Sequence, residues 1–145
     1  MRFPIVLLAL IAAAIALAAP AGAKAPIQIQ IQHTTHGCHT WSVGNNASRA
    51  SQTVRVHAGA TFTVTNNDVM PHTLVQLAGP KIALSTATMG HMSTMRMGHM
   101  GATTQFALRT PGTYRFTTKA GEDYPGVTVK TIGEDNVLRL TVVVA

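Results

Sequence analysis

Methionine and histidine are concentrated in one twelve-residue stretch, residues 89–100, in which the tetrapeptide Met-Gly-His-Met occurs twice. The stretch holds five of the chain's seven methionines and two of its seven histidines. Thioether sulfur is a good ligand for Cu(I), and imidazole binds Cu(II), Zn(II) and Ni(II). We therefore expect the stretch to hold copper through a change of oxidation state, with these candidate ligands: Met89, His91, Met92, Met95, Met97, His99 and Met100.

The alternative for these methionines is a buried stripe on a helix, because Met92, Met95 and His99 follow helical spacing. No Leu, Ile, Val or Phe accompanies them, however, and each of the glycines at 90 and 98 disfavours a helix by about 1 kcal/mol relative to Ala. The sequence instead predicts a flexible Met/His loop over residues 81–104. A connection of this length inside a compact domain is usually functional or disordered.

A second group of candidate ligands lies near the N-terminus, where three histidines and the chain's one cysteine fall between His33 and His39. A lone thiol in an oxidising compartment is open to oxidation unless it is buried or metal-bound. Cys38 and His39 are therefore candidate metal ligands, with a small buried hydrophobe as the alternative for Cys38. We expect His33 and His36 at the surface, with transient metal affinity, and Trp41 in the core.

The chain is expected to carry a secretory signal peptide followed by one domain. After Arg2 an apolar run leads to small residues up to Ala23, which is the pattern of a cleaved signal over residues 1–23. Residues 24–145 then form the domain, in a periplasmic or secreted protein that has no membrane contact after cleavage.

The net charge is +6, with basic residues scattered rather than clustered. This distribution argues against a nucleic-acid partner.

The rest of the chain predicts an all-β sandwich. Period-two alternation or β-branched runs mark the expected strands, Asn, Gly and Pro mark the turns between them, and short strands at such intervals are typical of sandwiches. The expected strands cover residues 27–32, 53–57, 61–65, 69–77, 106–109, 114–118 and 137–144. No sustained helical period occurs outside the signal segment.

Two stretches resemble the cupredoxins, the plastocyanin-like blue-copper family. Residues 59–73 contain a strand, an Asn-Asn-Asp turn and then Pro71-His72. In the family a Pro-His or Gly-His follows such a turn, and its histidine is the first copper ligand, which matches His72. Residues 110–116 are similar to the family's Pro-Gly-x-Tyr-x-Phe strand. The resemblance, from Thr53 to the C-terminus, implies a Greek-key β-sandwich of cupredoxin type and a copper cofactor.

The chain departs from that family where the other three ligands would follow. Thr118 stands at the cysteine position, and Gly121 and Gly126 stand near the histidine and methionine positions. A His2Cys site with an axial methionine cannot form there in the usual way. We expect instead a rebuilt site that joins Cys38 or His39, His72 and a methionine of the Met/His loop.

These observations predict a copper-binding protein that sequesters copper or passes it to a protein partner by ligand exchange. One alternative is an electron-transfer cupredoxin with an atypical copper–thiolate site at Cys38. Another is a metal-free interaction module whose Met/His loop docks a protein. We do not expect an enzyme, since the chain offers one domain with one incomplete site. The adjacent carboxylates Glu122 and Asp123 give no argument for hydrolysis, because they point to opposite faces of an extended chain.

Overall fold

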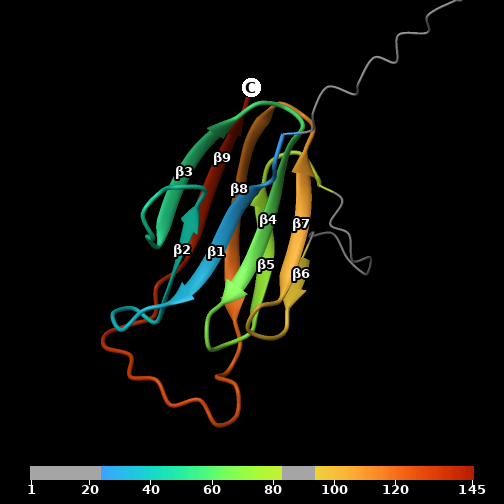
Figure 1. Ribbon diagram of the computed structural model, residues 1–145. Coiled ribbons are helices and arrows are strands. Elements are labelled where there is room, and N and C mark those ends of the chain that lie inside the picture. The colour runs from blue at the N-terminus through green and yellow to red at the C-terminus, as the bar shows by residue number, and fades with distance from the viewer. Residues whose placement is uncertain (1–23, 83–93) are drawn as a thin grey trace, which may run out of the picture.

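The computed structural model describes residues 24–82 and 94–145, and this part of the chain holds nine strands and no helix (Figure 1). The predicted signal peptide and three predicted ligands, Met89, His91 and Met92, lie outside the described residues. Within the two described ranges, no helix has the length and apolar character needed to cross a membrane.

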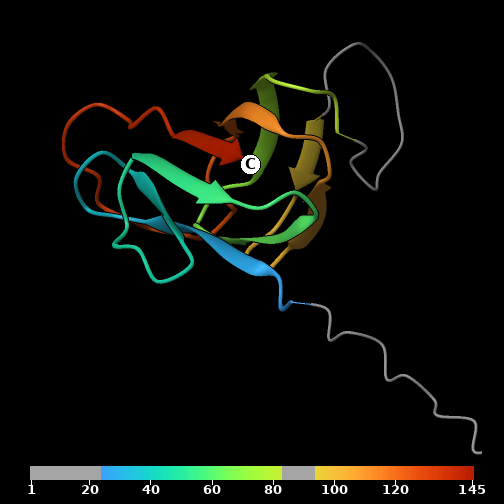
Figure 2. The same ribbon diagram turned by 90° about the horizontal axis from the view of Figure 1, so that it is seen from above.

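The strands form two mixed sheets that pack as a sandwich, and Figure 2 shows these two layers from above. The first sheet has the order β2-β1-β4-β7, with β1 and β4 parallel; its strands are β1 (Ile27–His33), β2 (His39–Val43), β4 (Ala60–Asn67) and β7 (Thr103–Leu108). The second has the order β3-β9-β8-β5-β6; its strands are β3 (Ser51–Val56), β5 (His72–Ala78), β6 (Thr94–Met97), β8 (Gly112–Ala120) and β9 (Arg139–Val144). The predicted all-β sandwich is confirmed.

The core lies between the sheets because alternate residues of each strand point inward. In β1, for example, Ile29 and Ile31 are fully buried while Gln28 and Gln30 are exposed. Three aromatic rings connect the two layers: Phe62 stacks on Phe106 at 5.1 Å between centroids, and Phe106 lies 5.2 Å from Phe116. Trp41 is fully buried, as expected for a core residue.

The segment predicted as a Met/His loop contains a strand. β6 pairs antiparallel with β5, so that Met97 lies opposite His72 and Met95 opposite Leu74. Met95 and Met97 are buried in the core, and Arg96 between them is exposed. This alternation is the period of a strand, so these two methionines are packing residues of a sheet rather than members of a mobile loop. β2 is not among the strands that the alternation pattern predicts.

Candidate metal centre

Four strand ends meet at one end of the sandwich, the lower end in Figure 1. β1 ends at His33, and a short connection leads into β2 at His39, which lies directly opposite His33 in the ladder. β4 is parallel to β1 and therefore ends at the same edge, where four residues lead into β5 at His72. The topology thus gathers three histidines around the turn that contains Asp68.

Asn66 and the backbone hold this turn in place. The Asp68 N–H donates to Asn66 Oδ1 at 2.9 Å, and Asn66 Nδ2 donates to the carbonyl of Met70, also at 2.9 Å. The Val69 N–H donates to Asp68 Oδ1 at 2.6 Å. Asp68 is fully buried and is directed at the histidines. A buried carboxylate requires charged or hydrogen-bonding partners, and here imidazoles supply them.

The side-chain atoms are spaced as ligands of one cation would be. Asp68 Oδ2 lies 3.1 Å from His72 Nε2 and 4.0 Å from His39 Nδ1. Asp68, His39 and His72 each offer one metal-ligating atom within 4.8 Å of the others. Ligands at 2.0–2.2 Å from a tetrahedral ion lie about 3.3 Å apart. These three residues therefore fit a small divalent cation after modest side-chain adjustment.

Two of the histidines have nitrogens with no hydrogen-bond partner in the part of the chain that the structure describes. Nδ1 of His33 and Nδ1 of His39 are both buried in this way. Buried polar atoms are nearly always satisfied, so each exception calls for an ion or an ordered water. Burial lowers the pKa of His39, and the neighbouring His72 lowers it further. A lowered pKa favours the neutral imidazole, which is the form that binds metals.

The second nitrogen of His72 contacts a hydroxyl on the neighbouring strand. His72 Nδ1 lies 3.2 Å from Thr118 Oγ1, which belongs to the neighbouring strand β8. A hydroxyl, rather than a thiolate, stands beside the histidine at this position.

Cys38 lies apart from the cluster, although it precedes His39 directly. The residue is 3% exposed, and its backbone has a positive φ of 61°. Its thiol hydrogen-bonds with the side chain of Thr131. Burial raises the pKa of the Cys38 thiol, and the negative charge of Asp135 raises it further. Cys38 is not one of the three residues whose ligand atoms gather at the Asp68 turn.

The predicted ligands are thus only partly brought together. His39 and His72 meet, while Cys38 is turned toward Thr131. His99 and Met100 lie exposed in the turn after β6, where His99 Nδ1 contacts the Met100 carbonyl at 3.0 Å. The sequence reasoning missed Asp68, which it placed in a turn, and expected His33 at the surface.

Two sequence signals could have pointed to these residues. Asp68 precedes His72 by four residues, with a turn and a proline between them. His33 and His39 flank a connection short enough for a hairpin, which places the two side chains opposite each other.

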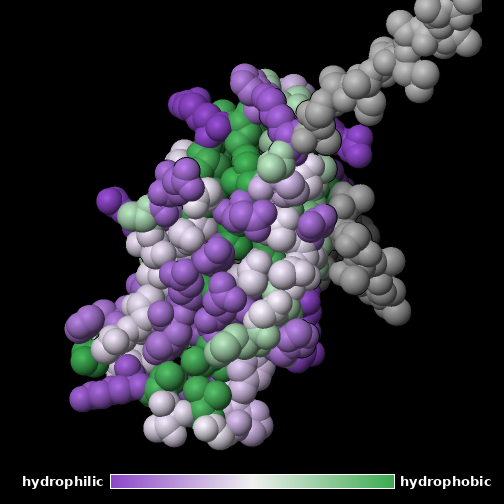
Figure 3. Space-filling view, viewed as in Figure 1, coloured by the Kyte–Doolittle hydropathy of each residue, from purple (hydrophilic) through white to green (hydrophobic). Residues whose placement is uncertain are grey.

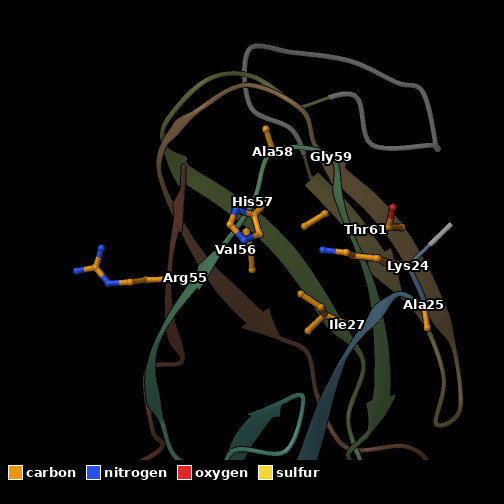
Figure 4. A pocket seen from close by; sticks show the side chains of 10 residues that line it. Lys24, Ala25, Ile27, Arg55, Val56, His57, Ala58, Gly59 and Thr61 are labelled. Atoms are coloured by element: carbon orange, nitrogen blue, oxygen red, sulfur yellow. The ribbon is translucent and has the colours of Figure 1, made fainter. Parts of the chain in front are cut away.

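A surface hollow of about 510 Å³ lies at the opposite end of the sandwich, between the starts of β1 and β4. Figure 4 shows Lys24 and His57 directed toward one another across it, with Ile27 below. Lys24, Arg55 and His57 line it, and no carboxylate or sulfur does. The hollow therefore lacks the donor set of the Asp68 cluster.

No family model and no curated protein matches the chain. Similar solved structures include a purple cupredoxin from Nitrosopumilus maritimus, at 15% identity and TM-score 0.45, covering 81% of this chain and 98% of that one. An amicyanin mutant in its reduced Cu(I) form has 16% identity and TM-score 0.43, covering 86% and 87%. Reduced auracyanin from the photosynthetic bacterium Roseiflexus castenholzii has 20% identity and TM-score 0.41, covering 86% and 99%. The cupredoxins that the motifs around His72 resemble thus recur among similar structures, while residue roles rest on this chain's own geometry.

Proposed function

We propose that this protein binds copper at the buried cluster of His39, Asp68 and His72, and stores it or passes it to a protein partner. The observation that carries the proposal is the pair of imidazoles converging on a buried carboxylate, with a ligand atom of each residue within 4.8 Å of the others. Two nitrogens and an oxygen suit Cu(II), Zn(II) and Fe(II), and among the divalent ions Cu(II) binds such sites most strongly.

Soft ligands at the same end of the sandwich favour copper over zinc. Met100 is 51% exposed, three residues after β6 ends, whereas Met97, opposite His72 in the ladder, is buried as a packing residue. Thioethers bind Cu(I) and add little to a zinc site. A protein that takes up or releases copper by ligand exchange needs soft ligands beside its main site, and the methionine-rich sequence supplies them.

The exposed surface at this end suits contact with a partner. Figure 3 shows hydrophobic side chains gathered near both ends of the visible face. Ile132 and Val137, on the connection between β8 and β9, are 45% and 56% exposed. That connection runs at the site end of the sandwich (Figure 1). We propose that a copper-exchange partner docks there, outside the cytoplasm, and that the protein acts by binding rather than by catalysis.

Trp41 provides a direct test, because it is the only tryptophan and lies two residues after His39 on the same inward face of β2. Bound Cu(II) quenches a nearby indole. We expect one equivalent of Cu(II) to quench the fluorescence of Trp41. His72→Gln should weaken the binding by more than about 100-fold, since even residues that only orient ligands contribute 10–100-fold. The matched control is His57→Gln, an exposed histidine at the other end. Undiminished quenching in His72→Gln would reject the site.

The electron-transfer alternative makes a different spectroscopic prediction. A copper–thiolate bond gives an intense visible charge-transfer band, and that band would have to vanish in Cys38→Ser. Cys38 is not among the three residues whose ligand atoms converge, which argues against such a bond. We expect a weakly coloured Cu(II) complex that is unchanged by Cys38→Ser. A chain that retains no copper at all would favour the metal-free interaction module.

A further inference from the structure

The residues around Asp68 differ in how far they are exposed. The side chains of Asp68 and His72 are fully buried, and that of His39 is 6% exposed. The side chain of His33 is 19% exposed, yet its Nδ1 atom is buried and has no hydrogen-bond partner among the described residues. One edge of the His33 ring therefore faces the cluster, and the rest of the ring reaches solvent.

Asp68 divides its two oxygens between these histidines. Oδ2 faces His72 at 3.1 Å and His39 at 4.0 Å, while Oδ1 faces Nδ1 of His33 at 3.6 Å. The last separation is too long for a hydrogen bond and close to the spacing of two ligands on one ion. His33 is not among the three residues whose ligand atoms lie within 4.8 Å of one another, so its ring has to turn toward the ion before it can act as a fourth ligand.

His33 is also the least firmly held of the three histidines. It is the last residue of β1, and the pairing of β1 with β4 ends one residue earlier, at Gln32 and Asn67. The His39 ring meets the His72 ring edge-on at 5.1 Å between centroids, and the His39 carbonyl accepts a hydrogen bond from Asn136 Nδ2 at 2.9 Å. His72 is held by Asp68 and Thr118 on its two ring nitrogens. The His33 ring can therefore move with the smallest loss of contacts.

We infer that His33 is the exchangeable fourth ligand of the proposed copper site, the position through which copper enters and leaves. This inference rests on the proposed function. It adds a His3Asp donor set in which three ligands fix the ion and the fourth faces solvent. Removal of His33 should lower copper affinity about 10-fold, less than removal of a buried ligand, and should open one coordination position to small molecules.

The test counts nitrogen ligands in the Cu(II)-loaded protein by pulsed electron paramagnetic resonance. The wild-type chain should show three imidazoles and His33→Gln two. His36→Gln is the matched control, since His36 is an exposed histidine on the same connection. Copper bound to the wild-type chain with the same nitrogen count as in His33→Gln would overturn this inference and leave the proposed function standing. Failure of the wild-type chain to bind copper would remove both.

A second variant separates ligation from a structural role. In His33→Ala, millimolar free imidazole should enter the vacated position, restore the third nitrogen and slow the removal of copper by a chelator. Imidazole should have no such effect on the wild-type chain. A His33→Ala protein that is folded by circular dichroism, binds copper and shows no response to imidazole would contradict an exchangeable ligand at this position.

Discussion

At the scale of single residues, the site depends on one buried carboxylate. Asp68 lies in the turn between the two sheets, with one imidazole in hydrogen-bond contact and two more within 4.0 Å. An ionised group in such a position costs several kcal/mol unless it is well paired. A bound divalent cation would offset that cost, so Asp68 links the stability of the turn to the binding of metal.

Asp68→Asn is therefore expected to separate binding from folding. The amide keeps the size of the side chain and can still accept the Val69 N–H through its oxygen, so the metal-free protein should melt at an equal or higher temperature. Cu(II) affinity, followed by Trp41 fluorescence, should fall by about 100-fold or more because the charged ligand is lost. Copper affinity close to that of the wild-type chain would show that Asp68 is not a ligand.

Cys38 gives a second prediction at this scale. The residue is 3% exposed, and burial raises the pKa of its thiol, so little thiolate forms near neutral pH. Alkylation by iodoacetamide at pH 8 should be at least about 100-fold slower in the native protein than in guanidinium chloride, because the reaction requires local opening. Mass spectrometry measures both rates. Rapid alkylation of the native chain would reveal an accessible thiolate and revive the copper–thiolate alternative.

At the scale of elements, the strands with clear alternation were predictable, and the contacts between distant segments were not. The patterns of β1, β4 and β8 stand out because each has one buried face. The pattern of β6 does not stand out, because its short Met-Arg-Met alternation lies within a stretch whose composition indicates metal binding. The motif identified His72, but Asp68 and His33 join it only through the parallel pairing of β1 with β4, a contact that leaves no local signal.

In the connection before β2, Gly37 lies close to the side chain of Asn136, and a substitution there can test this packing. Gly37 has φ +73°, and a Cβ there would lie 2.5 Å from the Asn136 side chain, which holds the His39 carbonyl. Gly37→Ala should destabilise the protein by roughly 1–3 kcal/mol and should also weaken copper binding. Gly126→Ala is the control, because Gly126 shares a positive φ of +80° but has open space around it. Denaturant melts and Trp41 titrations check both effects, and equal losses in the two variants would refute the steric account.

At the scale of the whole molecule, the candidate site joins the two layers of the sandwich. His33 and His39 come from the first sheet and His72 from the second, while Asp68 lies on the connection between them. A ligand that binds only the folded state stabilises it by mass action, by about 2.7 kcal/mol at 100 times its dissociation constant. A metal at this position would therefore act as a bridge between sheets.

The melting temperature should report the stabilisation that a metal between the two sheets provides. Saturating Cu(II) is expected to raise the melting temperature of the wild-type chain by on the order of 10 °C. A chelator should reverse the rise, and His72→Gln should abolish it. His57→Gln, at the far end of the sandwich, should keep it. An increase of equal size in His72→Gln would place the stabilising metal elsewhere.

The central claim is that imidazoles and Asp68 at the lower end of the sandwich, and not Cys38, hold copper. Electron paramagnetic resonance of the chain loaded with one equivalent of Cu(II) tests it most directly. We predict coupling to imidazole nitrogens that is reduced in His39→Gln and in His72→Gln, and a spectrum unchanged by Cys38→Ser. A spectrum that changes in Cys38→Ser and is indifferent to both histidines would contradict it.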